Sequence, residues 1–196
     1  MTNPTQPLPV RLRDTDRAAL EAHFLALAGE DRRLRFGGPI ADEGLREYVA
    51  RIDFERDGLF AVQDDQLRFA AVVHVAFTGP TAELGLSVLP DFRGKGMGNA
   101  LVQRAVMHLR NRGSKEVFVH CLSENEAMMH IARKNGMRII PCGPETDARL
   151  AIDPPTSESV VTEWVQDSHA RVVQTVRKNA LFSSALMKMF KPTGTR

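Results

Sequence analysis

The chain has 196 residues, 43% of them hydrophobic, which is enough for one domain with a real core and an appended helical segment. Its net charge of +2 is too small to argue for nucleic acid as a partner. Cys121 and Cys142 are its only cysteines, which suits a reduced protein better than a disulfide framework. No stretch approaches the ~18–20 apolar residues of a membrane span, and the first ten residues lack the apolar core of a signal peptide. We therefore expect a cytoplasmic protein with no transmembrane segment.

Hydrophobic periodicity predicts strands and helices that follow one another in the pattern of an α/β (α+β) domain. In chain order we expect a strand at 10–13, helices from residue 14 or 15 and at 42–52, strands at 59–63, 67–77 and 81–89, a helix ending near residue 112, a strand at 116–122, a helix at 125–134, and strands at 137–140 and 148–152. A helix between the strands at 81–89 and 116–122 makes these two strands parallel neighbours, which predicts a mixed sheet. If the two strands diverge, they leave a slot for an extended cofactor.

The chain divides into three expected segments: a disordered arm at 1–9, a domain at 10–153, and a basic, amphipathic helical tail at 154–196. In the tail, valines recur at helical spacing, and from residue 169 onward there are six Lys or Arg and no Asp or Glu. The usual interpretation is a helix that packs on its own core with a solvated basic face. A homodimer contact, an anionic lipid surface and a negatively charged partner are the alternatives.

A glycine-rich turn joins the strand at 81–89 to the helix that follows it. Its residues, Arg93-Gly94-Lys95-Gly96-Met97-Gly98, have the spacing Arg-x-x-Gly-x-Gly. Three glycines within five residues let successive N–H groups point into one concavity, and the following helix adds the positive end of its dipole. Such a nest holds phosphate or pyrophosphate, whereas the alternative is an ordinary strand-to-helix turn. Arg93 and Lys95 either add positive charge toward the phosphate or are exposed loop cations.

This turn and a second motif resemble those of the GNAT superfamily of N-acetyltransferases. The second motif is the segment from Asn125 to Met137, and the resemblance covers residues 10–152. It implies the GNAT fold, a mixed six- to seven-stranded sheet flanked by helices, here with a C-terminal helical extension. It also implies acetyl-CoA as co-substrate and direct transfer of an acetyl group to an amine, with no metal and no nucleic acid.

A narrower resemblance points to the bacterial Pat-type protein lysine acetyltransferases. Residues 32–36, residues 51–57 and the pair Ala82-Glu83 are similar to that group. The implied acceptor is a protein lysine. A small-molecule amine is the alternative acceptor, and a catalytically silent acyl-CoA-binding sensor or interaction module is the alternative outside the enzymes. Pat-type domains are often fused to a synthetase-like or cyclic-nucleotide-binding region, and this sequence contains neither.

The resemblance assigns roles to residues around the turn. The implied cofactor-binding residues are Leu86, Ser87, Val88, Arg93, Gly94, Lys95, Gly96, Met97, Gly98 and Asn125. An acceptor ammonium, with a pKa of about 10.4, must lose a proton before it attacks the thioester. We expect Glu83 to be the general base, on the strand face opposite Leu84 and Leu86 and partly buried beside the acceptor. An exposed carboxylate or an ion-pair partner of Arg35 is the alternative role.

One position departs from the family pattern. Many GNAT enzymes carry a tyrosine seven residues after the motif asparagine, where it protonates the departing thiolate. Ala132 occupies that position here and cannot donate a proton. The Pat-like group commonly lacks this tyrosine as well, but its absence also suits a silent acyl-CoA sensor.

The remaining polar residues are weaker candidates. His120 and Cys121 flank the expected cofactor slot, but a core or strand-face role is favoured, and His74 is expected to be structural. The other histidines lack metal-ligand spacing, so we expect no metal site. The arginines at 32, 33 and 35 either line the acceptor cleft or cap the first helix, the second being slightly favoured.

Overall fold

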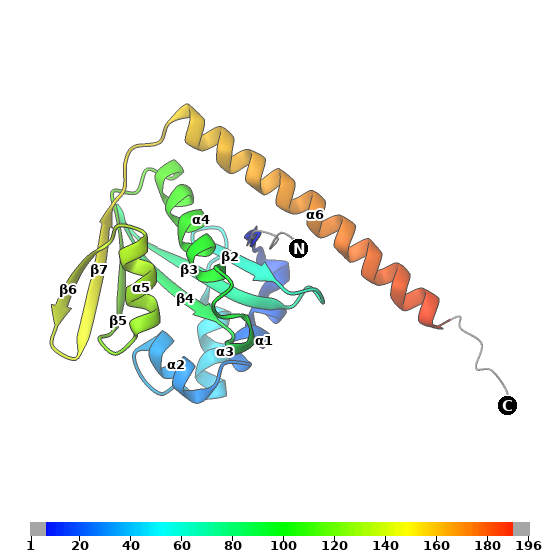
Figure 1. Ribbon diagram of the computed structural model, residues 1–196, viewed down its shortest axis with the longest axis horizontal. Coiled ribbons are helices and arrows are strands. Elements are labelled where there is room, and N and C mark those ends of the chain that lie inside the picture. Colours follow the sequence, from blue (N-terminus) through cyan, green and yellow to red (C-terminus); the bar gives the residue numbers. More distant parts are fainter. Residues whose placement is uncertain (1–6, 190–196) are drawn as a thin grey trace.

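The computed structural model describes residues 7–189, which form a seven-stranded mixed sheet with helices on both faces and one long projecting helix (Figure 1). The strands are β1 (Val10–Arg11), β2 (Gly58–Gln63), β3 (Phe69–Thr78), β4 (Thr81–Val88), β5 (Glu116–Leu122), β6 (Arg138–Cys142) and β7 (Glu145–Ala151), in the sheet order β1-β2-β3-β4-β5-β7-β6. The helices are α1 (Arg17–Leu25), α2 (Gly29–Phe36), α3 (Asp42–Arg51), α4 (Met97–Asn111), α5 (Glu126–Lys134) and α6 (Ser157–Met189), with 3₁₀ turns η1 (Asp14–Asp16) and η2 (Pro90–Phe92). This architecture confirms the predicted fold class.

The pairing of β4 with β5 creates an opening in the sheet. The two strands run parallel, and their register extends from Thr81–Glu116 to Glu83–Phe118. Beyond this point β4 continues to Val88 paired with β3, while β5 continues to Leu122 paired with β7. The predicted divergence of the two strands is therefore confirmed, and Glu83 lies at its apex.

Alternating side chains on the central strands feed two separate cores, which fix the sheet between its helices. The core against α4 and α5 includes Phe60, Val73, Leu84, Leu101 and Leu109. The core against α1 and α3 includes Leu20, Phe24, Leu45, Leu59 and Val72. Burying each such side chain stabilises the fold by roughly 1.5–3 kcal/mol. The core against α4 and α5 also includes Ala82, which together with Leu84 holds one face of β4.

Helix α2 is not among the helices that the sequence predicts. None of its residues is fully buried, so it lacks the apolar periodicity that marks the other helices. Instead, Arg32 links α2 to the end of α1, because its guanidinium donates to the carbonyls of Leu25 (2.8 Å) and Leu27 (2.9 Å). For Arg32, the favoured role of capping the first helix is confirmed.

Buried charges attach the first half of α6 to α4. Arg104 of α4 is 3% exposed and pairs with Glu163 (2.8 Å) and Asp167 (2.6 Å). His108 and Asn111 also donate to the Glu163 carboxylate. Burial alone would raise the pKa of Glu163, but these hydrogen bonds and the Arg104 charge outweigh it and lower the pKa to about 2. Glu163 is thus ionised at neutral pH.

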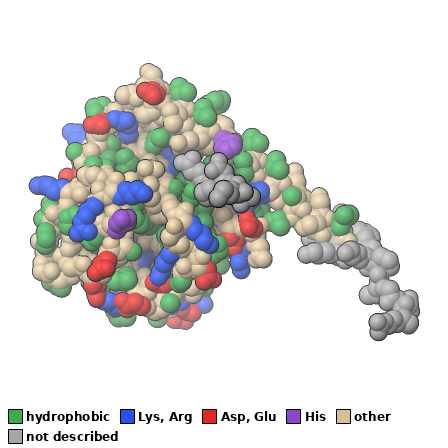
Figure 2. Space-filling model, viewed as in Figure 1, with side chains coloured by type: hydrophobic (Ala, Val, Ile, Leu, Met, Phe, Trp, Pro, Cys, Tyr) green, Lys and Arg blue, Asp and Glu red, His purple; other side chains and the backbone are tan. Residues whose placement is uncertain are grey.

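The outward side of α6 carries exposed apolar side chains in addition to exposed basic ones such as Arg171 and Lys178, whereas the sequence favours a solvated basic face alone. An apolar stripe, made of Val161, Trp164, Val165, Val172 and Val176, is between 51% and 67% exposed. Figure 2 shows hydrophobic side chains along the projecting helix. The spacing of the valines predicts that they pack on the domain. In the structure, α6 contacts α4 through polar side chains instead, and the valines face outward.

Parts of the predicted termini fall outside the described residues. These are positions 1–6 of the arm expected at 1–9 and positions 190–196 of the expected tail. Within the described range, no helix combines the length and apolar character that crossing a membrane requires.

The Arg104 anchor leads to a stability prediction. Replacing Arg104 with Met should lower the free energy of unfolding by about 3–5 kcal/mol, because two acidic side chains lose their buried cation. Arg110→Met is the matched control, since Arg110 lies on the same helix and pairs with the exposed Asp153 (2.8 Å). Its loss should cost only about 0–1 kcal/mol. Urea denaturation measures both values, and equal losses would contradict the anchoring role.

Candidate active site

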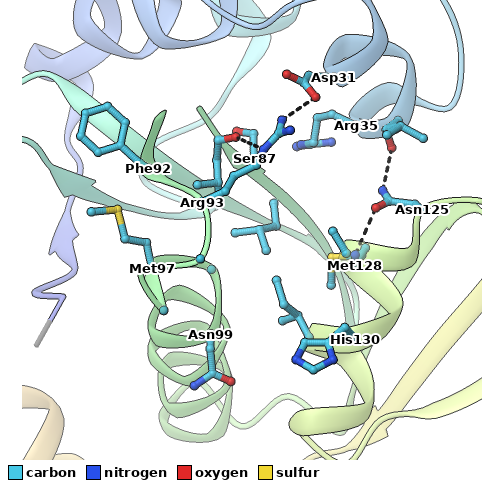
Figure 3. Close-up of a pocket in the computed structure, with 18 of the residues that line it drawn as sticks. Asp31, Arg35, Ser87, Phe92, Arg93, Met97, Asn99, Asn125, Met128 and His130 are labelled. Atoms are coloured by element: carbon cyan, nitrogen blue, oxygen red, sulfur yellow. Dashed lines mark hydrogen bonds and ion pairs between the residues drawn. The ribbon is translucent and has the colours of Figure 1, made fainter. Parts of the chain in front are cut away.

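A pocket of about 490 Å³ lies beside the part of β4 that extends beyond the parallel register (Figure 3). Its walls come from α2, the end of β4, the glycine-rich turn with the first turn of α4, and α5. Nine of the ten expected cofactor-binding residues line it: Leu86, Ser87, Val88, Arg93, Gly94, Gly96, Met97, Gly98 and Asn125. Lys95 is not part of this wall. The sheet and its crossover thus bring both sequence motifs to one cavity.

The glycines of the turn serve two different purposes. Gly94 and Gly96 have φ angles of 72° and 76°, in the left-handed region that side chains disfavour. Gly98 provides close packing instead, since an added Cβ would lie 2.8 Å from Cδ1 of Ile131 and 3.3 Å from Cδ2 of Leu86. The turn therefore brings the N-terminus of α4 directly against β4 and α5. A helix N-terminus placed in this way attracts anions.

The two cations of the turn behave differently. Arg93 forms an ion pair with Asp31 of α2 at the pocket wall and also donates to the Val88 carbonyl. Lys95 donates to the carbonyl of Asp91 (2.8 Å) and lies 5.0 Å from the centre of the Phe92 ring. Of these two residues, therefore, only Arg93 lines the pocket.

Asn125 links α5 to α2 across the opening. Its Oδ1 accepts from the Met128 N–H (3.1 Å), which caps α5, and its Nδ2 donates to the Leu34 carbonyl (3.3 Å). Arg33 adds a second link through its ion pair with Glu124 (2.7 Å). Two polar contacts therefore join helix α2, a wall of the pocket, to the N-terminal end of α5.

Glu83 lies at the apex of the divergence, with a geometry that differs in part from expectation. It shares a face with Gly85, while Leu84 is buried on the other face, as expected. Its side chain is exposed and does not line the pocket, so the expected partial burial is wrong. Two of its neighbours on this face, Gly85 and Ala76, have little or no side chain with which to cover it. Among residues 7–189, no ion pair joins Glu83 to Arg35.

A chain of hydrogen bonds that the sequence did not predict leads from the pocket into the sheet. Arg35 donates to the Tyr48 oxygen (3.1 Å), which lies 2.6 Å from Nδ1 of His74, whose Nε2 is 3.1 Å from Asp57. Burial lowers the pKa of His74, against the opposing hydrogen bond to Asp57. Burial would raise the pKa of Asp57, but hydrogen bonds from Arg56 and His74 lower it. A neutral imidazole therefore lies next to an ionised carboxylate.

The side chain of Ser87 is committed to the core. Its Oγ lies 2.8 Å from Nε2 of His23, whose Nδ1 is 2.8 Å from the Phe69 carbonyl. Burial lowers the pKa of His23 to about 4, so the ring is neutral at pH 7. Because the carbonyl accepts from Nδ1–H, Nε2 accepts from the Ser87 hydroxyl. Ser87 can therefore offer a ligand only its backbone.

The remaining candidates separate clearly. His120 pairs with Asp147 (2.8 Å) on a strand face, and Cys121 lies in the core, which confirms the favoured structural roles. Ala132 is fully buried. His130 of α5 does line the pocket, although its position in the sequence carried no signal for this.

The dual role of Asn125 can be separated by two substitutions. Asn125→Ala should destabilise the protein by about 1 kcal/mol, because α5 loses its cap. Asn125→Asp keeps the capping oxygen but loses the donor to Leu34, so it should retain most of that stability. Both variants should speed amide hydrogen exchange in α2, measured by mass spectrometry. Unchanged exchange in α2 would show that this contact does not hold the helix.

Comparison with known proteins agrees with this architecture. Residues 26–137 match the model of the Acetyltransferase (GNAT) family. The mycothiol acetyltransferase of Propionibacterium freudenreichii subsp. shermanii is 27% identical over 111 residues, which cover 53% of this chain and 35% of that protein. The chain thus spans about a third of the length of that relative.

Solved structures share the fold at low sequence identity. The GNAT domain of S. lividans PAT matches with a TM-score of 0.64 and 17% identity, over 73% of this chain and 89% of that domain. The spermidine N-acetyltransferase of Vibrio cholerae, solved with CoA and spermine, matches with a TM-score of 0.60 and 18% identity, over 76% of this chain and 96% of that one. The Pat-type domain is therefore one of several acetyltransferases whose fold resembles that of this chain. Together with the family match over more than half its length, these findings show that the chain belongs to the GNAT acetyltransferase family.

Proposed function

We propose that this protein transfers an acetyl group from acetyl-CoA to an amine, by direct attack of the amine on the thioester. The observation that carries the proposal is the end of the β4–β5 register at Glu83–Phe118, with a pocket beyond it that reaches the glycine-rich turn. An extended cofactor can lie along the free side of β4. The V. cholerae relative, solved with CoA, supports this choice of cofactor.

The pocket wall suits the parts of CoA. Its pyrophosphate would lie against the turn from Arg93 to Gly98, where the left-handed glycines and the α4 N-terminus favour an anion. The amides of the pantetheine arm would pair with backbone groups of Leu86 to Val88, in the place that a strand would otherwise take. Asn125 would hold α5 against the other side of the arm. The thioester then lies toward the apex of the divergence.

Glu83 is the residue we propose as general base. The acceptor ammonium loses a proton to Glu83, directly or through a water molecule. The amine nitrogen then bonds to the acetyl carbon, and the carbon–sulfur bond breaks to release the CoA thiolate. Ala132 supplies no proton to this thiolate, so the second proton that the amine nitrogen loses reaches the thiolate through water. The exposure of Glu83 leaves it open to an approaching amine.

The acceptor has two candidates. The resemblance to Pat-type enzymes favours a protein lysine, and the fold match to the S. lividans PAT domain is consistent with it. The names of the other relatives, a mycothiol and a spermidine acetyltransferase, favour a small-molecule amine. Release of free thiol from acetyl-CoA, measured with lysine peptides and with small amines, distinguishes them. Tight CoA binding with no thiol release on any acceptor would support the sensor alternative instead.

The role of Glu83 leads to a kinetic prediction. Glu83→Gln should lower kcat by about 10²-fold or more, because the amine loses its proton acceptor. The dissociation constant for CoA, measured by calorimetry, should stay the same. Glu47→Gln on the exposed side of α3 is the control and should leave both values unchanged. Normal turnover in Glu83→Gln would remove this residue from the mechanism.

For the apolar stripe of α6, we propose a second copy of the chain as the partner. The stripe begins at Val161 and continues 4, 11 and 15 residues later with Val165, Val172 and Val176. This spacing places the four valines on one face of the helix. Exposed Glu158 lies near the start of α6, and exposed Lys178 lies in its second half. An antiparallel partner helix would therefore bring unlike charges together while it covers the stripe.

This pairing can be tested by the mass of the protein in solution. Val165→Glu with Val172→Glu should convert a dimer into a monomer in sedimentation equilibrium, because four charges would be buried in one interface. Gln166→Glu adds the same charge at a neighbouring exposed position and should leave the dimer intact. A wild-type protein that is monomeric at all concentrations would contradict the pairing.

A further inference from the structure

We propose that Arg35 forms a carboxylate-binding subsite beside the reacting centre. The acceptor is then an amine that carries a carboxylate close to its nitrogen, such as a free α-amino acid. This inference rests on the acetyl transfer proposed above and favours the small-molecule acceptor over a protein lysine. It follows from the charge, the position and the hydrogen bonds of one side chain.

Arg35 differs from its neighbours in lacking a counter-ion. The other arginines of α2 are paired, Arg32 with Asp42 (2.6 Å) and Arg33 with Glu30 (2.7 Å), and Arg93 across the pocket pairs with Asp31. Within residues 7–189, Arg35 has no carboxylate partner, and its Nε is buried without any hydrogen-bond partner. A half-buried cation without a counter-ion retains a desolvation penalty that a ligand carboxylate would relieve.

The position of the guanidinium points to the acceptor rather than to the cofactor phosphates. It lies flat against Gly85, where an added Cβ would be 2.0 Å from Nη2 and 2.2 Å from Cζ of Arg35. Gly85 and Glu83 share one face of β4, about 6–7 Å apart along the strand. The proposed proton acceptor and an unmatched cation are therefore neighbours at the apex of the opening. An α-amino acid can present its amine to Glu83 and its carboxylate to Arg35 at the same time.

A lone ammonium would fit this surface poorly. A cation beside the reacting centre repels a positively charged acceptor, and the repulsion is greater in a pocket than in water. A carboxylate on the acceptor turns this repulsion into a charged, bidentate hydrogen bond, which guanidinium groups form well. The subsite therefore discriminates between amino acids and amines that lack the carboxylate.

The chain of hydrogen bonds behind Arg35 sets its orientation. Ionised Asp57 accepts from Nε2–H of His74, so Nδ1 of the neutral ring accepts from the Tyr48 hydroxyl. The Tyr48 oxygen is then free to accept from Arg35. This commits one N–H of the guanidinium and holds the plane of the group against Gly85. Tyr48 is accordingly a positioning residue for the subsite.

The alternative role for Arg35 is purely structural, since its guanidinium also lies 4.8 Å from the centre of the Phe36 ring.

The test uses the twenty α-amino acids and their α-carboxamides as acceptors, with thiol release from acetyl-CoA as the readout. We expect at least one acid to exceed its amide in kcat/KM by about 10- to 100-fold, the factor that a charged hydrogen bond supplies. Arg35→Gln should abolish this preference through KM, while the CoA dissociation constant stays within twofold.

Two further variants separate binding from folding. Tyr48→Phe keeps the ring packing but loses the hydroxyl, so it should lower the preference for the acid while leaving the amide rates unchanged. Arg46→Gln is the control and should leave the preference intact, because Arg46 of α3 is exposed and already pairs with Glu21 of α1 and Glu43 of α3. Amides that react as well as acids, or an equal loss for both in Arg35→Gln, would overturn the proposal.

The outcome for the subsite is distinct from the outcome for the activity. If no acceptor releases thiol, the acetyl transfer proposed above fails. The subsite is then tested by calorimetric titration of the CoA-bound protein with the same amino acids. Saturable binding that Arg35→Gln removes supports the subsite, and the absence of binding by any of them overturns it.

Discussion

β4 and β5 share three residue pairs, from Thr81–Glu116 to Glu83–Phe118, and separate beyond them. The separation is stable because each strand keeps its antiparallel partner on the other side, β3 for β4 and β7 for β5. Ala82 and Leu84 also anchor one face of β4 in the core against α4 and α5. Backbone groups on the open side of β4 are left for a ligand, and buried backbone groups of this kind require hydrogen-bond partners. The pocket, the glycine-rich turn and Glu83 all take their positions from this opening.

Helix α2 closes one side of the opening through ion pairs, and its Phe36 packs against the core. It has no fully buried residue, and ion pairs from Asp31 to Arg93 and from Arg33 to Glu124 join it to the two walls of the pocket. Exposed ion pairs contribute only about 0–1 kcal/mol each. This wall of the pocket is thus held less firmly than β4, whose Ala82 and Leu84 are buried in the core.

The cofactor side of the site could be predicted from the sequence because its signals are local. The glycines at 94, 96 and 98 and the apolar strand before them specify a turn, and the crossover helix after them requires β5 to be parallel. The acceptor side could not, since it depends on contacts distant in the sequence. Arg35, Tyr48, His74 and Asp57 come from three elements and a loop. The exposure of Glu83 and the outward valines of α6 were missed for the same reason: both depend on which surfaces the neighbouring elements cover.

A crystal structure of the protein with acetyl-CoA tests the central claim most directly. We expect the pyrophosphate against residues 93–98, the pantetheine arm along Leu86 to Val88, and the thioester at the apex beside Glu83. In this arrangement, the register of β4 and β5 would still end at Glu83–Phe118. Acetyl-CoA bound elsewhere, or a thioester remote from the end of this register, would contradict the account.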